Sequence, residues 1–79
     1  MALKELVELI ANQLVDDPSS VVVREIDEGG RVRVELQVSK EDMGRVIGKG
    51  GRVANSIRVL LRVAAARAGK KVTLDIVEP

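Results

Sequence analysis

Gly48, Lys49, Gly50 and Gly51 are the residues of this sequence whose types and spacing are best suited to chemistry. Glycines permit the positive φ angles of an abrupt turn between helices, and they leave no side chain in the way of a ligand. Main-chain N–H groups at the start of the following helix can then face anionic oxygens, which the positive end of the helix dipole also favours. Lys49 adds a positive charge at the tip. The pattern therefore predicts a loop that holds a phosphodiester backbone.

The residues around these glycines favour binding over a plain turn. A Gly-x-x-Gly spacing is short and common, so by itself it indicates only a tight connection between helices. Here the apolar pair Val46-Ile47 precedes the glycines, Arg45 and Arg52 flank them, and a helical pattern lies on each side. Together these features are typical of an anion-binding loop.

Basic residues are concentrated in the second half of the chain, although the net charge is only +1. Residues 1–39 contain four bases and eight acids. Residues 43–74 contain no acid and eight bases, namely Arg45, Lys49, Arg52, Arg58, Arg62, Arg67, Lys70 and Lys71. Such a one-sided segment predicts a surface for a polyanion, whereas ordinary solvated charges are the simpler alternative.

The composition excludes several classes of site. The chain has no Cys, no His and no aromatic residue, so it lacks a thiolate ligand, an imidazole base and a platform for stacking bases. Glu41 and Asp42 are neighbours on a predicted helix and point in different directions, so they make a poor acid–base pair. Gly50 stands where a nucleotide-binding P-loop needs Ser or Thr. We therefore expect neither catalysis nor a bound metal ion or other cofactor.

The chain also lacks the patterns of membrane and export segments. Acids lie within its first turns, where a signal peptide would be basic and then apolar. No stretch approaches the roughly 20 apolar residues of a membrane span. We expect one domain over residues 1–79 of a cytoplasmic protein.

Apolar periodicity predicts a helix followed by two strands. Apolar residues recur at helical spacing over residues 3–14, and the Asp-Asp-Pro sequence at 16–18 should end that helix. Residues 21–26 are β-branched and extended, and either face could point inward. A Glu-Gly-Gly turn at 28–30 joins them to residues 31–38, which alternate in polarity. The face of this second strand that should be buried carries Val32, Val34, Leu36 and Val38.

Two helices and a last strand should follow. A short helix is predicted over residues 40–47, begun by Ser39 and Asp42 as a capping box. It should bury Met43, Val46 and Ile47. A longer helix is predicted over 52–68, and an alternating strand over 71–77. The core-facing residues predicted on the longer helix are Val53, Ile57, Leu60, Leu61, Ala64 and Ala68.

The resulting order α-β-β-α-α-β implies an α+β fold with a three-stranded mixed sheet. A hairpin makes the first two strands antiparallel, and a right-handed helical crossover makes the last strand parallel to strand 31–38. The helices should cover one face. The other face should stay in water and carry Arg31, Arg33, Glu35 and Thr73.

Residues 45–52, Arg-Val-Ile-Gly-Lys-Gly-Gly-Arg, resemble the signature of the KH domain. The element order is similar to the type II arrangement of that domain. The flanking segments 42–45 and 55–58 resemble the bacterial KhpA family, and this resemblance covers essentially the whole chain. It implies a type II KH domain whose sheet is covered on one face by three helices. It also implies a small RNA-binding protein that acts as an RNA chaperone or post-transcriptional regulator.

The same resemblance implies a groove beside the loop for single-stranded RNA. Such grooves hold about four nucleotides, with bases on aliphatic side chains. The RNA-binding residues expected by resemblance are Gly48, Lys49, Gly50, Gly51, Arg45, Arg52, Val46, Ile47 and Val53. Families of this kind also self-associate and pair with a larger partner that carries its own KH domain and a second nucleic-acid-binding domain.

The remaining bases of the second half are harder to interpret. Arg58 and Arg62 fall opposite the predicted core stripe, and Arg67 lies near its edge, where its stem can cover apolar surface. Lys70 and Lys71 precede the last strand. We assign these five residues at most a supporting electrostatic role.

A second apolar stripe lies on the longer helix. Val59, Val63 and Ala66 recur at helical spacing on a face distinct from the predicted core stripe. A second stripe usually needs another surface to cover it. The hypothesis is a homodimer contact, and the alternative is that the sheet and the first helix bury both stripes.

Two rival functions stay open. A KH fold can serve as a protein-interaction module with little RNA affinity, because a fold does not imply a function. The glycines and Lys49 favour RNA binding over that alternative. Single-stranded DNA is the second rival ligand, since nothing in the sequence identifies a reader of the 2′-hydroxyl.

Overall fold

Helix α1 (Leu3–Leu14) opens the computed structural model, which describes residues 2–79. Val7 and Ala11 are buried, and the other apolar residues predicted to face inward pack around them. The helix ends two residues before the predicted Asp-Asp-Pro stop, where the amide of Val15 donates to the carbonyl of Ala11 at 3.1 Å. A single 3₁₀ turn, η1 (Pro18–Ser20), leads into the sheet.

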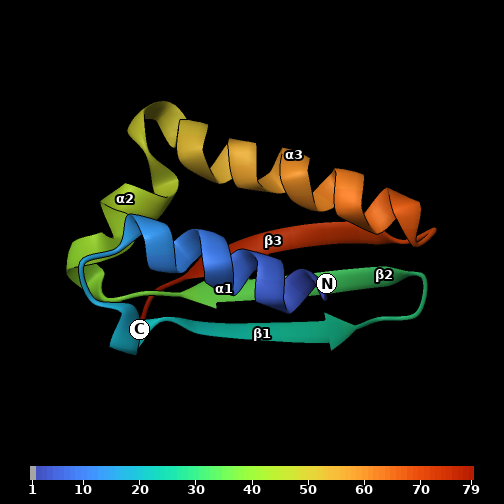
Figure 1. The fold of residues 1–79 in the computed structure, drawn as a ribbon, viewed down its shortest axis with the longest axis horizontal. Helices are drawn as coiled ribbons and strands as arrows, with labels where there is room; N and C mark the ends of the chain where they lie inside the picture. The colour runs from blue at the N-terminus through green and yellow to red at the C-terminus, as the bar shows by residue number, and fades with distance from the viewer. Residues whose placement is uncertain (1) are drawn as a thin grey trace.

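The sheet has three strands, β1 (Val22–Asp27), β2 (Arg31–Gln37) and β3 (Lys71–Val77), in that spatial order (Figure 1). β1 pairs antiparallel with β2, and β3 pairs parallel with β2 on its other side. Gly29, at φ +83°, forms the turn between the first two strands. The predicted mixed sheet and its order are therefore confirmed, and β3 is an edge strand.

Two α-helices and two 3₁₀ turns connect β2 to β3. The short helix predicted over residues 40–47 is divided into a 3₁₀ turn, η2 (Lys40–Asp42), and helix α2 (Met43–Ile47). A further turn, η3 (Lys49–Gly51), precedes the long helix α3 (Arg52–Arg67).

The predicted capping box at the start of the short helix is wrong. The Ser39 hydroxyl donates to the Asp42 carboxylate at 3.0 Å, and Ser39 accepts no capping bond from the helix. The Asp42 carboxylate instead accepts the amides of Asp16 and Asp17, each at 3.1 Å. The Asp42 carboxylate therefore joins this segment to the residues that follow α1, a contact that local sequence does not predict.

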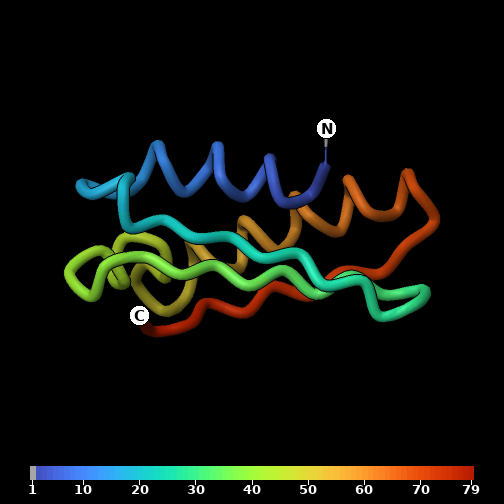
Figure 2. The backbone as a smooth tube through the Cα atoms, turned by 90° about the horizontal axis from the view of Figure 1, so that it is seen from below, coloured from blue at the N-terminus to red at the C-terminus, as the bar shows by residue number. Residues whose placement is uncertain are grey.

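The helices lie on one face of the sheet. Figure 2 shows α1 as a layer of its own alongside the strands, and α1, α2 and α3 contact one another. The opposite face carries ion pairs, in which Glu35 accepts from Arg24 at 3.0 Å and from Arg33 at 2.7 Å. The division into a covered face and an open, charged face is as predicted. Within residues 2–79, no helix has the length and apolar character needed to cross a bilayer.

The buried face of α3 is rotated from the predicted one. Ala54, Ile57, Leu61 and Ala65 are buried, whereas Leu60 is 51% exposed. Ala68 is exposed as well, because α3 ends one residue earlier. Two of these four buried residues are alanines, which a count of large apolar residues overlooks. The buried apolar cluster consists of Val7, Ala11, Val23, Val32, Val34, Leu36, Val38, Val46, Ile57, Leu61 and Leu74.

Candidate nucleic-acid interface

The glycine loop forms an open bend between α2 and α3. Gly48, Gly50 and Gly51 have φ angles of +76°, +64° and +78°, which L-residues rarely adopt. Two backbone hydrogen bonds fix the bend, from the Gly48 amide to the Gly44 carbonyl at 2.9 Å and from the Gly51 amide to the Gly48 carbonyl at 3.1 Å. Lys49 and Gly50, at its tip, are exposed. A polynucleotide can therefore reach the loop.

The glycines of this loop serve two different purposes. A Cβ atom on Gly48 would lie 2.5 Å from Cγ2 of Val53 and 2.8 Å from the Val53 amide nitrogen, so Gly48 is needed for packing. A Cβ on Gly50 would meet nothing within 4 Å, and one on Gly51 would meet only Nδ2 of Asn55 at 3.9 Å. The space above Gly50 and Gly51 is therefore open to an incoming backbone.

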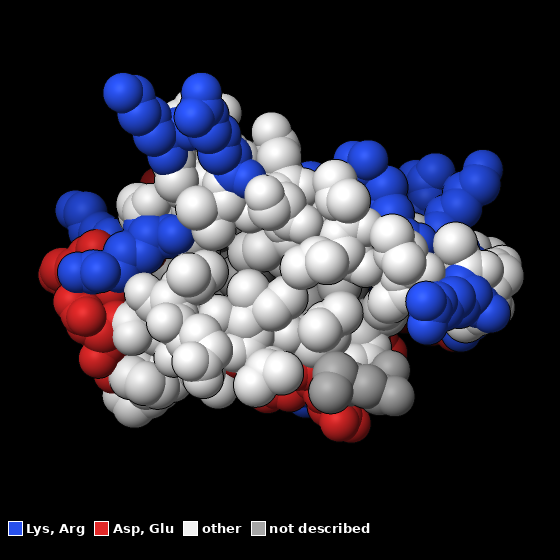
Figure 3. Space-filling model, turned by 45° about the horizontal axis from the view of Figure 1, so that its top comes forward, with Lys and Arg blue, Asp and Glu red and all other residues white. Residues whose placement is uncertain are grey.

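Positive charge surrounds this open space. Lys49 and Arg52 are exposed, and neither takes part in an ion pair within residues 2–79. In the same part of the chain, no side chain caps the N-terminus of α3. Figure 3 shows Lys and Arg side chains gathered near the start of α3 and again near its other end. The N-terminal amides and these two cations favour an anion at the loop.

Arg45 is less available than the sequence indicated. Its guanidinium pairs with the Asp16 carboxylate at 2.9 Å and with the Asp42 carboxylate at 3.4 Å. Two carboxylates beside the guanidinium offset part of its attraction for a further anion. Arg45 thus helps to attach α2 to the end of α1, and Lys49 and Arg52 remain as the cations beside the bend.

The three apolar residues predicted to form the groove floor, Val46, Ile47 and Val53, differ in how exposed they are. Ile47, predicted to be buried, is 37% exposed, Val53 is half-buried, and Val46 is completely buried in the core. Val46 can therefore support the floor from below and cannot touch a ligand. Ile47 also lines a depression of about 360 Å³, whose other walls are Lys40, Met43, Glu78 and Pro79.

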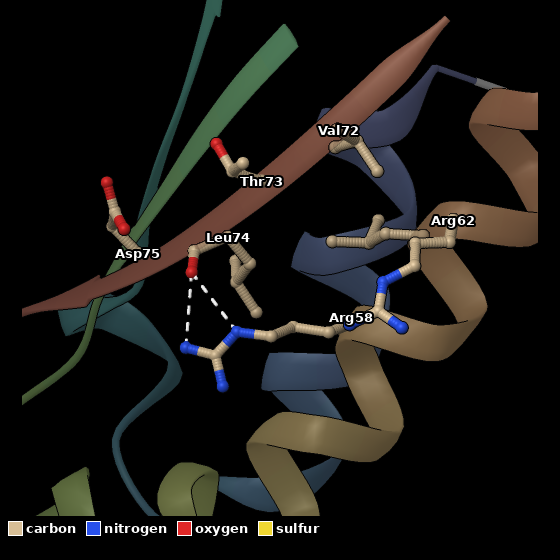
Figure 4. Close-up of a pocket in the computed structure, with 7 residues that line it drawn as sticks. Arg58, Arg62, Val72, Thr73, Leu74 and Asp75 are labelled. Carbon is tan, nitrogen blue, oxygen red and sulfur yellow. Dashed lines mark hydrogen bonds between the residues drawn. The ribbon is translucent and has the colours of Figure 1, made fainter. Parts of the chain in front are cut away.

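A second depression, of about 430 Å³, lies between α3 and the free edge of β3 (Figure 4). Arg58 reaches across it and donates to the Leu74 carbonyl, at 3.4 Å from Nε and 3.2 Å from Nη2. Its Nη1 donates to Oδ1 of Asn55 at 3.1 Å. The depression is lined by Arg58, Leu61, Arg62, Val72, Thr73, Leu74 and Asp75.

Arg58 and Arg62 were predicted to lie opposite the core stripe of the helix, and that prediction is wrong for Arg58. Because the core stripe of α3 is rotated, Arg58 is half-buried at the boundary with β3. Arg62 is exposed but lies one turn further along the same depression. Local sequence does not predict that Arg58 and Arg62 line this depression, because that depends on which strand forms the edge of the sheet.

Asp42, directly before α2, is a buried carboxylate at 2% exposure. Its hydrogen bonds from the Asp16 and Asp17 amides and the Ser39 hydroxyl, together with the Arg45 charge, hold the pKa of Asp42 below its ordinary value, although burial opposes this. The carboxylate is thus ionised at neutral pH, and its partners are Asp16, Asp17, Ser39 and Arg45 of the fold itself. Among residues 2–79, no three acidic side chains converge as a metal site would require.

A family model matches nearly the whole sequence of the chain. Residues 4–76 match the model of the family described as KhpA/KhpB, KH domain. The chain belongs to this family. Its KH domain is 49% identical to the RNA-binding protein KhpA of Clostridium perfringens over 75 residues, which cover 95% of this chain and all of that protein. It is 44% identical to the RNA-binding protein KhpA of Aquifex aeolicus, with 98% of each chain covered.

Solved structures show the same KH fold. A structure of Era in complex with MgGDPNP and nucleotides 1506–1542 of 16S ribosomal RNA matches with a TM-score of 0.67 at 23% identity. Era of Aquifex aeolicus bound to GDP.AlF4⁻ matches with a TM-score of 0.64, also at 23% identity. Each match covers 96% of this chain, which spans 29% of the length of the Era chain. The likeness confirms the type II KH fold expected from the sequence.

Proposed function

We propose that this KH domain binds single-stranded RNA, with its phosphates at the Gly48–Gly51 bend. The observation that carries the proposal is the exposed bend, where Gly50 and Gly51 leave the main chain open and Lys49 and Arg52 have free charges. The KhpA relatives, at 44–49% identity, are named RNA-binding proteins. Their similarity over the full length of the chain supports RNA over single-stranded DNA.

The bases of the bound strand would lie against the apolar surface beside the bend. Ile47 and half-buried Val53 offer aliphatic contacts, and the chain has no aromatic residue on which bases could stack. A groove with an aliphatic floor beside a glycine loop holds a short single strand, which suits an RNA chaperone or a post-transcriptional regulator in the cytoplasm. In this role the protein binds and does not catalyse.

The test is a charge reversal within the bend. Lys49→Asp combined with Gly50→Asp places two acids where phosphates would lie, and RNA binding should be lost while circular dichroism stays unchanged. The matched control is Lys4→Asp with Gly29→Asp, which replaces another exposed lysine and another positive-φ glycine with open space around it. A folded Lys49→Asp/Gly50→Asp protein that still binds RNA would refute the assignment. Equal binding of a DNA strand of the same sequence would contradict the preference for RNA.

We further propose that α3 mediates a homodimer contact. Val59, Leu60 and Val63 are 53%, 51% and 54% exposed, and Ala66 beside them is also exposed. Figure 3 shows an uncharged surface between the two groups of basic side chains. Exposed apolar patches of this kind are typical of protein contacts. The same surface could serve a larger partner with its own KH domain, in place of a second copy.

A further inference from the structure

A third depression lies at the end of the molecule opposite the glycine bend. It has a volume of about 360 Å³ and is lined by Arg31, Arg62, Lys70, Lys71, Val72 and Thr73. Its residues come from the first position of β2, the last turns of α3 and the start of β3. The four basic residues among them, Arg31, Arg62, Lys70 and Lys71, are called the distal basic cluster.

Main-chain contacts hold the distal basic cluster in place. The Lys70 amide donates to the Ala65 carbonyl at 2.9 Å, and the Lys71 amide donates to the Gly30 carbonyl at 3.1 Å. The second bond joins β3 to the turn that precedes Arg31, so the bases approach one another from separate elements. The cluster is therefore a consequence of the tertiary fold, although its two lysines are adjacent in sequence.

The charges of this cluster are not neutralised within the fold. Among residues 2–79, none of Arg31, Arg62, Lys70 or Lys71 takes part in an ion pair, and no acid lines the depression. Arg24, Arg33 and Arg45, in contrast, are all paired with carboxylates. Four unpaired cations around one hollow repel one another, and a bound polyanion would relieve that repulsion.

The depression continues the one that Arg58 crosses. The two share Arg62, Val72 and Thr73, so they form one path along the free edge of β3. Helix α3, with 16 residues, spans roughly 24 Å at 1.5 Å per residue. The glycine bend comes directly before α3, and the distal basic cluster gathers around the last turns of α3 and the start of β3, beyond the other end of the helix (Figure 1). A strand held at the bend would thus meet the cluster only after passing along α3.

We infer that the distal basic cluster is a second phosphate-binding site for the same RNA strand. A KH glycine loop clamps about four nucleotides. The distal basic cluster would bind a longer strand at phosphates outside that stretch. This inference rests on the proposed function, because the RNA must first be held at the bend. Its consequence is a dependence on RNA length, which the bend alone would not produce.

The experiment compares two RNA lengths with a pair of matched variants. The cluster variant is Lys70→Gln with Lys71→Gln, and the control is Lys4→Gln with Arg67→Gln, which removes the same charge from exposed residues that do not line the depression. Fluorescence polarisation is measured with an RNA of four nucleotides and one of roughly ten nucleotides. The cluster variant should bind the longer RNA roughly tenfold more weakly and lower its salt slope by about 1.4, for two lost contacts. The shorter RNA should bind all three proteins equally.

The other outcomes distinguish a failure of the proposed function from a failure of the second site. A wild-type protein that binds neither RNA would refute the proposed function itself. A wild-type protein that binds both, with equal affinity of cluster and control variants for the longer RNA, would refute only the second site. A cluster variant that weakens both RNAs to the same degree would show general attraction by charge, which also refutes the second site. Circular dichroism of each variant establishes that it is folded.

Discussion

Gly48 packs against Val53 so closely that the space between them cannot hold a methyl group. A Cβ on Gly48 would lie 2.5 Å from Cγ2 and 2.9 Å from Cβ of Val53, at a φ of +76°. Both the contact and the backbone angle oppose any side chain. The sharp entry into α3, and with it the position of the bend, depends on this contact.

Gly48→Ala should therefore lower the free energy of unfolding by roughly 2–4 kcal/mol, from backbone strain together with overpacking. Gly50→Ala should cost only about 1 kcal/mol, because its Cβ would enter open space at a φ of +64°. Gly44→Ala, in α2 with open space around it, should be neutral or stabilising. Urea unfolding of the three variants checks this order, and equal values for Gly48 and Gly50 would contradict it.

The Asp42 carboxylate should make stability depend on pH in the acid range. Its pKa lies below the ordinary value of 3.8, chiefly because the Asp16 amide donates to it. A carboxyl with a lowered folded-state pKa stabilises the fold above its unfolded pKa, and this contribution is lost as pH falls through the folded pKa. Asp42→Asn should therefore be less stable at neutral pH, with a difference that shrinks below about pH 4.

Urea unfolding of wild type and Asp42→Asn across that pH range measures the difference. Some pH dependence should persist in the variant, because the Ser19 and Ser20 hydroxyls lower the pKa of Asp17 as well. Glu41→Gln, an exposed neighbour, is the control and should change little. A difference between wild type and Asp42→Asn that stays constant down to the lowest pH would rule out ionisation as its cause.

The affinity for single-stranded RNA should fall as salt rises, because phosphate contacts release counterions. Each contact contributes about −0.7 to the slope of log K against log salt. Lys49→Ala should weaken binding at low salt and make the slope shallower by roughly 0.7. Arg45→Ala should change the slope less, since its guanidinium is paired with Asp16 and Asp42. Titration at several salt concentrations tests both, and a larger change for Arg45 would contradict the assignment of the free cations.

The exposed stripe on α3 should control self-association. Light scattering at tens of micromolar should give the mass of a dimer for the wild type, and Val63→Asp should give a monomer, because a buried carboxylate opposes the contact. Leu9→Asp changes an equally exposed apolar residue on α1, at 52% exposure, and should leave the mass unchanged. A monomeric wild type would refute the dimer. A Leu9→Asp monomer would place the contact elsewhere.

Periodicity in the sequence was enough to predict the sheet and the order of its elements. Alternation over residues 31–38 predicted that Val32, Val34, Leu36 and Val38 are buried, and all four are. The glycines at 48, 50 and 51 predicted a sharp bend with positive φ angles, and each of the three has a positive φ. These features are local, because strand alternation and backbone angles depend on a few consecutive residues.

Contacts between distant residues were decided by the tertiary structure alone. Arg45 pairs with Asp16, 29 positions away, and Arg58 donates to the Leu74 carbonyl, 16 positions away. The face that α3 buries was mispredicted for Leu60, because two apolar stripes share that helix and only packing against the sheet selects between them. The sequence by itself determined a bend suited to phosphate. The tertiary structure decided which bases stay free to use it, because a cation's availability depends on which carboxylates the fold brings beside it.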